Sequence, residues 1–124
     1  MMGYMKNTSI TLYGIPNCDT VKKARAWLVE HGVTATFVDF KKQGAPAELL
    51  PIWAAAVGWE RLLNRKGTSW RKLEESVRAA VLDERSAIAL MLAQPSVIKR
   101  PVVAWHDGDI TVGFDALGWL ERVS

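Results

Sequence analysis

A single cysteine, Cys18, is present among the 124 residues, and this scarcity is the first constraint on the chain. One thiol can form neither an internal disulfide nor a cysteine-rich metal site. Long apolar runs are also missing. The longest candidate, Ala87 to Ala93, is far shorter than the roughly 18–20 residues that a membrane-spanning helix needs. We therefore expect a protein without a metal centre and without a membrane span.

The composition also lacks a strong excess of charge of one sign. Lys and Arg number 16 against 13 Asp and Glu, and this net charge of +3 is too small to indicate a nucleic-acid partner. With 49% hydrophobic and 23% charged residues, the chain is not expected to be disordered. Its length fits one domain, residues 1–124, and no feature demands a dimer, so a monomer is the expectation.

The first residues, Met1 to Thr8, carry no recognisable targeting signal. They contain one lysine, no apolar run and no small-residue cleavage site. We interpret them as a short extension or an alternative start. A cytoplasmic location follows as an expectation, because a lone cysteine remains a thiol in that reducing compartment.

The N-terminal third predicts a strand, a helix and a second strand. These elements are expected at Ile10–Tyr13, Asp19–His31 and Ala35–Phe40. The helix is indicated by an apolar stripe and a terminating glycine, namely Val21, Ala24, Trp27, Leu28 and Gly32. Such a unit implies two parallel strands joined by a right-handed connection.

The middle of the chain, from Pro46 to about Gln94, is predicted to be helical. Apolar residues at helical spacing surround Pro51, so the first helix is either kinked there or begins later. Thr68 or Ser69 is expected to cap a short second helix that contains Lys72 and Leu73. The third helix is expected at Asp83–Ala93, with Ile88, Met91 and Leu92 on one face.

The C-terminal third predicts a hairpin and a closing helix. The strands Val102–Trp105 and Ile110–Val112 flank the Asp107-Gly108 pair, which favours a tight turn between antiparallel strands. The helix Phe114–Val123 is expected to direct Leu117 and Leu120 inward. The whole order is that of a thioredoxin-like α/β fold: a four-stranded mixed sheet with a helical insertion at about residues 46–94.

Cys18 is the most informative residue for function. It ends the loop after the first strand, so the N–H groups and the positive dipole end of the following helix point at its thiol. Both effects favour the thiolate and lower the pKa of the cysteine. The alternative is a small buried hydrophobic residue, but the polar neighbours Asn17 and Asp19 are poor company for a core thiol.

Two further segments are candidates for the same site. Arg100 precedes Pro101 before an apolar strand, and the predicted topology brings this loop beside Cys18, where the guanidinium could bind an anion. The alternative is a solvated Lys99-Arg100 pair and an ordinary proline at a strand start. The stretch from Leu62 to Trp70 could cover the site or be a capped turn. His31 and His106 have no partner at metal-ligand spacing.

Three motifs, in this order along the chain, resemble those of the arsenate reductase/Spx-like family (the ArsC/Spx/YffB type). They are Tyr13-Gly-Ile-Pro-Asn-Cys-Asp-Thr-Val-Lys-Lys-Ala, Gly58-Trp-Glu-Arg-Leu-Leu-Asn-Arg-Lys-Gly-Thr and Ile98-Lys-Arg-Pro-Val-Val. The resemblance extends from Ile10 to about Val123. It implies a thioredoxin-like fold, a redox cysteine at Cys18, an anion-binding arginine at Arg100 and a cis-proline at Pro101.

Departures from the family pattern indicate the subgroup. Arsenate reductases of this family carry three arginines around the cysteine. Here the second falls on Asn64, with Arg65 one place later, and the third falls on Gly113. Each missing charged contact weakens oxyanion binding by roughly 1.5–3 kcal/mol. Spx-type regulators usually carry a Cys-x-x-Cys switch, but Val21 occupies the second position, so no intramolecular disulfide can form.

The pattern is therefore most similar to the YffB-like subgroup, which implies a glutathione-dependent thiol reductase with one reactive cysteine, Cys18. Glutathione is then a co-substrate rather than a bound cofactor. The other expected partners are a thiol or mixed-disulfide substrate and glutaredoxin. The residues expected to bind glutathione or substrate are Asn17, Asn64, Arg65, Thr68, Arg100 and Pro101. The alternatives are a glutathione- and glutaredoxin-linked arsenate reductase, or a non-catalytic Spx-like module that binds RNA polymerase.

Overall fold

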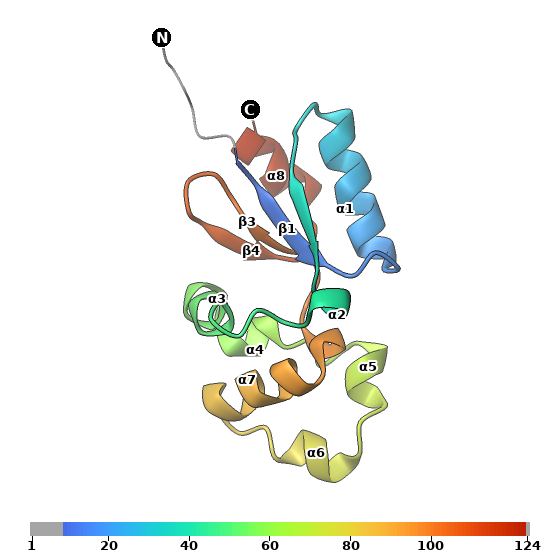
Figure 1. Cartoon of the computed structure of the whole chain (residues 1–124), viewed down its shortest axis with the longest axis vertical. Coiled ribbons are helices and arrows are strands. Elements are labelled where there is room, and N and C mark those ends of the chain that lie inside the picture. The colour runs from blue at the N-terminus through green and yellow to red at the C-terminus, as the bar shows by residue number, and fades with distance from the viewer. Residues whose placement is uncertain (1–8, 124) are drawn as a thin grey trace.

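A computed structural model describes residues 9–123, and within them a four-stranded mixed sheet forms the centre of the molecule (Figure 1). The strands are β1 (Thr11–Gly14), β2 (Thr36–Asp39), β3 (Val102–Ala104) and β4 (Ile110–Val112), in the spatial order β2-β1-β3-β4. β1 pairs with β2 in parallel, whereas β1–β3 and β3–β4 are antiparallel. The predicted α/β class, the parallel unit and the hairpin are confirmed. The interpretation of Met1 to Thr8 lies outside the described residues.

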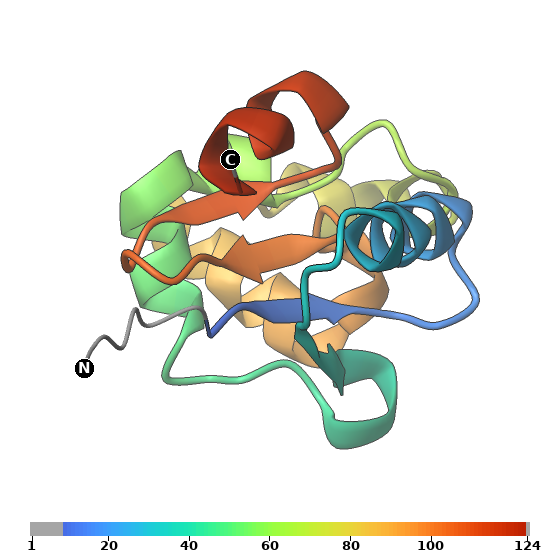
Figure 2. The same ribbon diagram turned by 90° about the horizontal axis from the view of Figure 1, so that it is seen from above.

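Helices cover both faces of the sheet. They are α1 (Asp19–Glu30), α2 (Phe40–Gln43), α3 (Leu50–Val57), α4 (Trp59–Leu62), α5 (Thr68–Arg71), α6 (Glu75–Ala79), α7 (Glu84–Ala93), a 3-10 turn at Pro95–Val97 and α8 (Ala116–Val123). Figure 2 shows α1 and α8 on one face, and Figure 1 shows the helices of the insertion gathered at the lower end of the molecule. No helix within residues 9–123 is long and apolar enough to cross a membrane.

The alternation of side chains along each strand divides the interior into two cores. Leu12 and Val103 point into the core shared with α1 and α8, whereas Val102 joins the core built with the inserted helices. In that second core Trp53 of α3 is almost fully buried and meets Tyr13 edge-on at 4.8 Å between ring centroids. The insertion is thus packed on the sheet and shares its hydrophobic core.

The ends of the inserted helices are set by their sequence. α3 begins at Leu50 with Pro51 in its first turn. Backbone N–H groups in the first turn have no partner within the helix, so the missing N–H of proline costs no hydrogen bond there. α7 begins with a capping box, in which Asp83 and Ser86 satisfy each other's backbone N–H groups. The cap predicted at Thr68 or Ser69 is wrong. The N-cap of α5 is Gly67, and the helix ends at Arg71, before Lys72 and Leu73.

Two predictions of helix orientation are also wrong. Leu117 and Leu120 of α8 are 78% and 45% exposed, and the helix instead buries Trp119 against the ring of Trp105 at 5.2 Å. In α7 Met91 is buried and Ile88 packs against the core as expected, but Leu92 is 43% exposed and the face is completed by Ala87 and Leu90 instead. In α8 the opposite face carries the larger aromatic surface, and burying that surface gives the greater hydrophobic gain.

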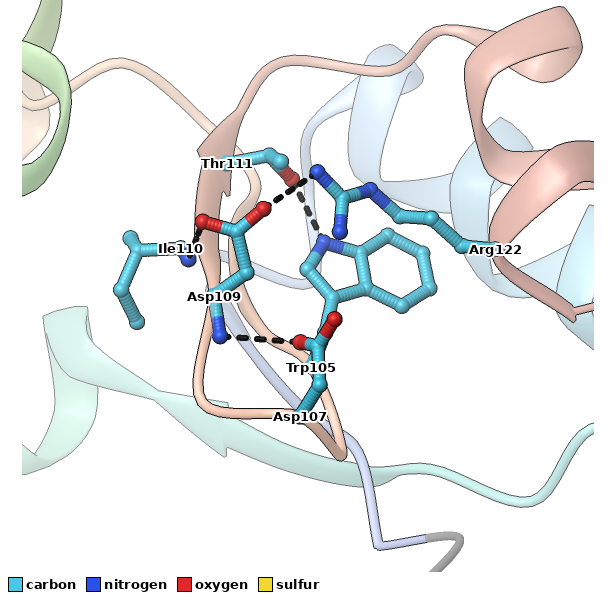
Figure 3. Close-up of polar contacts among 6 residues, drawn as sticks. All are labelled: Trp105, Asp107, Asp109, Ile110, Thr111 and Arg122. Atoms are coloured by element: carbon cyan, nitrogen blue, oxygen red, sulfur yellow. Dashed lines mark hydrogen bonds and ion pairs between the residues drawn. The ribbon is translucent and has the colours of Figure 1, made fainter.

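A polar cluster fastens α8 to the β3–β4 hairpin (Figure 3). The Arg122 guanidinium donates to Asp109 Oδ2 at 2.6 Å and lies over the ring of Trp105, 5.2 Å from its centroid. The indole Nε1 of Trp105 donates to Thr111 Oγ1 at 2.9 Å. These contacts hold α8 against the turn end of the hairpin. The open end of the same hairpin, before β3 and after β4, leads to the candidate site.

Candidate active site

Cys18 lies at the N-terminal end of α1, where the loop after β1 turns into the helix. Its extended backbone (φ −139°, ψ 122°) makes it the N-cap residue, and its carbonyl accepts the Lys22 N–H at 2.9 Å. The side chain is partly exposed and makes no capping bond within the helix. The thiol therefore sits where unpaired helix N–H groups and the helix dipole favour negative charge, as the sequence predicts.

The pKa of the Cys18 thiol is lowered from its ordinary value by its surroundings. Burial is the largest single influence and raises the pKa. It is outweighed by the N–H groups of Val21 and Thr20 and by the charge and N–H groups of Arg100, which together favour the thiolate. The helix start and a cation from a distant segment of the chain thus both contribute to the shift.

Arg100 is held in place by backbone carbonyls on its own segment. Its Nη1 donates to Ser96 O at 2.6 Å and reaches Ile98 O at 3.4 Å. The Arg100–Pro101 peptide bond is cis. Arg100 Nε is buried and has no hydrogen-bond partner among the described residues. The guanidinium also lines the cavity at Cys18, where its charge acts on the thiol and is suited to bind an anionic group of a ligand.

The thiol opens into a cavity of about 390 Å³. Its walls come from the start of α1, the loop after α4, the segment before β3 and the turn between β4 and α8. The lining residues are Cys18, Thr20, Asn64, Lys99, Arg100, Val112, Gly113, Phe114 and Asp115. The structure therefore places two of the predicted binding residues, Asn64 and Arg100, in one cavity with Cys18.

Asn64 reaches this cavity because its loop is tied to the segment that carries Arg100. The Asn64 N–H donates to Val97 O at 2.8 Å, and the Lys99 N–H donates to Leu62 O at 2.7 Å. The side chain of Asn64 folds over Gly67, where a Cβ would lie only 2.6 Å from Asn64 Nδ2. Gly67 is thus the residue that allows this close approach.

The other predicted binding residues lie around the cavity rather than in it. Arg65 lines a neighbouring cavity of about 410 Å³ and stands 3.7 Å from Glu60. Asn17 and Thr68 are exposed and line neither cavity. Pro101 is buried, and its carbonyl accepts the Gly113 N–H at 2.9 Å.

Sequence reasoning missed several lining residues. Thr20 follows Cys18 in the first turn of the helix, and this position alone could have identified it. Lys99 was interpreted only as half of a solvated pair, although it neighbours Arg100. The resemblance already places Gly113 at the position of an arginine near the cysteine, but Phe114 and Asp115 carry no local pattern of a binding site, and only the return of the chain after β4 brings them to Cys18.

A metal site has no support in the part of the chain that is described. No group of three or more His, Cys, Asp or Glu side chains within residues 9–123 is arranged to hold an ion. His31 stacks on Trp27 with 3.8 Å between ring centroids, and its Nδ1 lies 2.9 Å from Trp27 O. This places His31 at the far end of α1 from Cys18.

Comparison with known proteins gives consistent matches over nearly the whole chain. The model of the ArsC family matches residues 13–121. A solved YffB protein is 49% identical, with a TM-score of 0.85 over 93% of this chain and 99% of its own. An arsenate reductase (ArsC) related protein from Brucella melitensis is 51% identical, with a TM-score of 0.72 over 98% and 97%. An uncharacterized protein from Haemophilus influenzae is 39% identical over 86% of this chain and 91% of its own.

Proposed function

Because the chain belongs to the ArsC family, whose model matches residues 13–121, we propose that it is a redox enzyme: a glutathione-dependent thiol reductase that works with Cys18 alone. The observation that carries this proposal is that Cys18, whose pKa is lowered, and the guanidinium of Arg100 line one cavity. The lowered pKa increases the thiolate fraction available for attack, and the guanidinium is a donor for a ligand carboxylate.

In the first step the Cys18 thiolate attacks the glutathione sulfur of a mixed disulfide between glutathione and the substrate. A bond forms between Cys18 Sγ and that sulfur, the original S–S bond breaks, and the substrate leaves as a thiolate that takes up a proton. In the second step the thiolate of a second glutathione attacks the same glutathione sulfur. Oxidised glutathione leaves and Cys18 returns as the thiolate.

The absence of a second cysteine makes this the only disulfide exchange route open to the chain by itself. No residue of the chain can resolve a disulfide on Cys18, so an external thiol must do so. Buried Val21 occupies the place where a second thiol of a Cys-x-x-Cys pair would lie. Each turnover therefore consumes one reduced glutathione: the mixed disulfide and one glutathione thiol become the substrate thiol and one oxidised glutathione.

Glutathione has the chemistry that the cavity can bind. One of its carboxylates would accept from the guanidinium of Arg100, which lines the cavity, and the carboxamide of Asn64 offers a donor and an acceptor to its peptide groups. With Asn64 and Gly113 in place of further cations, the cavity contains Arg100 and Lys99 against Asp115. This balance suits a singly charged carboxylate better than a doubly charged oxyanion.

The proposal is tested by intact-mass analysis of the reduced protein after brief exposure to oxidised glutathione. We expect a single adduct of one glutathionyl group on the wild type, none on Cys18→Ser, and its removal by reduced glutathione. The absence of an adduct at alkaline pH, where any accessible thiol ionises, would contradict the proposal.

Steady-state assays then separate this activity from the alternatives. We expect glutathione-dependent reduction of a mixed-disulfide substrate. Arg100→Ala should raise the KM for glutathione and, by raising the pKa of Cys18, should also slow the attack on the mixed disulfide at neutral pH. Consumption of glutathione that depends on arsenate would favour the arsenate reductase. Binding to RNA polymerase that is indifferent to Cys18→Ser, without turnover, would favour the partner-binding module.

A further inference from the structure

A second cavity adjoins the cavity at Cys18. The two, of about 390 and 410 Å³, share the lining residues Asn64, Lys99 and Val112, and together they are called the groove, which starts at the thiol. The outer half is walled by α4, by the loop that follows it and by the end of β4. A single groove of this extent can hold more than the group that Cys18 attacks.

The groove concentrates positive charge. Its cationic side chains are Arg61, Arg65, Lys66, Lys99 and Arg100, and its carboxylates are Glu60 and Asp115. Five cations against two carboxylates leave an excess of three, as large as the net charge of +3 of the whole chain. The remaining surface is therefore balanced overall, and the groove is the place where an anionic partner is attracted.

The carboxylates neutralise little of this charge. Within residues 9–123 Glu60 pairs with Arg65 alone, at 3.7 Å, and both side chains are exposed, so screening by water weakens the pair. Asp115 lies directly before α8, with Oδ2 2.5 Å from the position of a Cβ on Gly118, so it faces the first turn of that helix. Arg61 and Lys66 line the outer half without an ion pair within the described residues.

We propose that the outer half of the groove binds acidic residues that flank the target cysteine of a polypeptide substrate. This inference rests on the proposed function and specifies its substrate class: mixed disulfides of glutathione with cysteines next to Asp or Glu. The glutathionyl group occupies the inner half of the groove at Cys18 and Arg100. The bound substrate chain extends from there into the outer half, past Lys99 and Lys66. A nucleic acid would meet the same charges but offers no disulfide to the thiol at the groove's end.

The test uses three synthetic peptides that differ only beside one cysteine, which is joined to glutathione in a mixed disulfide. The flanking residues are Glu, Gln or Lys, and kcat/KM is measured through the formation of oxidised glutathione. We expect the Glu peptide to exceed the Lys peptide by about tenfold at low ionic strength, chiefly through binding and association rate. The ratio should shrink towards one in about 0.5 M salt.

Charge reversal assigns the preference to the groove. In the double variant Arg61→Glu/Lys66→Glu we expect the order of the peptides to invert. The matched control is the double variant Lys41→Glu/Lys42→Glu, which changes the net charge by the same amount. Its two residues lie in α2, which follows β2 at the sheet edge opposite β4. The control should keep the wild-type order.

The outcomes for this inference and for the proposed function are separable. Equal kcat/KM for the three peptides, or an unchanged order in the Arg61→Glu/Lys66→Glu variant, would overturn the acidic-substrate inference while leaving the reductase in place. Failure of Cys18 to accept a glutathionyl group from any of the peptides would overturn both.

Discussion

The guanidinium of Arg100 lies beside the thiol of Cys18 and helps to lower its pKa, although one residue precedes β3 and the other precedes α1. The two loops meet because β1 and β3 are antiparallel neighbours, with Tyr13 opposite Val102. The start of α1 contributes N–H groups to the same thiol. The reactivity of Cys18 is therefore a property of the assembled sheet.

The first prediction concerns the ionisation of Cys18. Arg100→Met removes a charge and donors that favour the thiolate, so we expect the pKa of Cys18 to rise and its alkylation by iodoacetamide at pH 7 to slow. The pH dependence of alkylation gives the pKa directly. Arg85→Met, on α7 and outside the groove, is the control and should leave the profile unchanged. An unaltered pKa in Arg100→Met would contradict this account of the site.

A second prediction concerns oxyanions. Asn64→Arg would place a further cation in the cavity with Cys18 and Arg100, where one charge-assisted contact contributes roughly 1.5 kcal/mol. We expect inhibition by phosphate or arsenate to strengthen about tenfold, measured as the inhibition constant against glutathione. Asn64→Gln should not change it. Equal inhibition of Asn64→Arg and wild type would show that Asn64 does not limit anion binding.

The third prediction concerns the insertion. Trp53 is 1% exposed and packs on Tyr13, so Trp53→Ala should lower the free energy of unfolding by about 3–5 kcal/mol. The adjacent Ile52 is 55% exposed on the same helix, and Ile52→Ala should cost less than about 0.5 kcal/mol. Urea denaturation measures both. Similar losses for the two variants would mean that α3 is not held to the sheet through Trp53.

The ion pair between Arg122 and Asp109 provides a fourth prediction, on pH and stability. The pair holds the pKa of Asp109 below its ordinary value, because Arg122 donates to the carboxylate. Its stabilisation is therefore present above the unfolded pKa of about 3.9 and is lost as the pH falls through the lower folded pKa. For a pair this exposed we expect a coupling of about 0.5–1 kcal/mol near pH 7.

A double-mutant cycle of Asp109→Asn and Arg122→Met, run by urea denaturation at pH 7 and at low pH, measures this coupling. It should shrink in the acid, where the carboxyl is protonated. A coupling that persists at the lowest pH would assign it to a hydrogen bond between Arg122 and the neutral carboxyl instead of to the ion pair.

Much of the fold follows from local sequence. The short apolar runs predict all four strands, and the Asp107-Gly108 pair predicts the hairpin, where Gly108 adopts φ 89°. The place of Cys18 between a strand and a helix is equally local, because turn residues separate two periodic segments. These features depend on residues that are close together in the chain, so they can be predicted without knowledge of the tertiary structure.

Tertiary structure decided which helix faces are buried and which residues meet Cys18. The apolar residues of α8 lie on two sides, Leu117 with Leu120 and Trp119 with Val123, and helical periodicity permits either to face inward. The side with Trp119 faces inward because its ring packs against Trp105, which follows β3, and Trp27 of α1. Likewise Lys99, Phe114 and Asp115 carry no local mark of a common site with Cys18. They converge because sheet pairing and the loop contacts at Val97 and Leu62 bring distant segments together. Contacts between distant segments produce no periodic pattern in the sequence, so sequence periodicity cannot predict them.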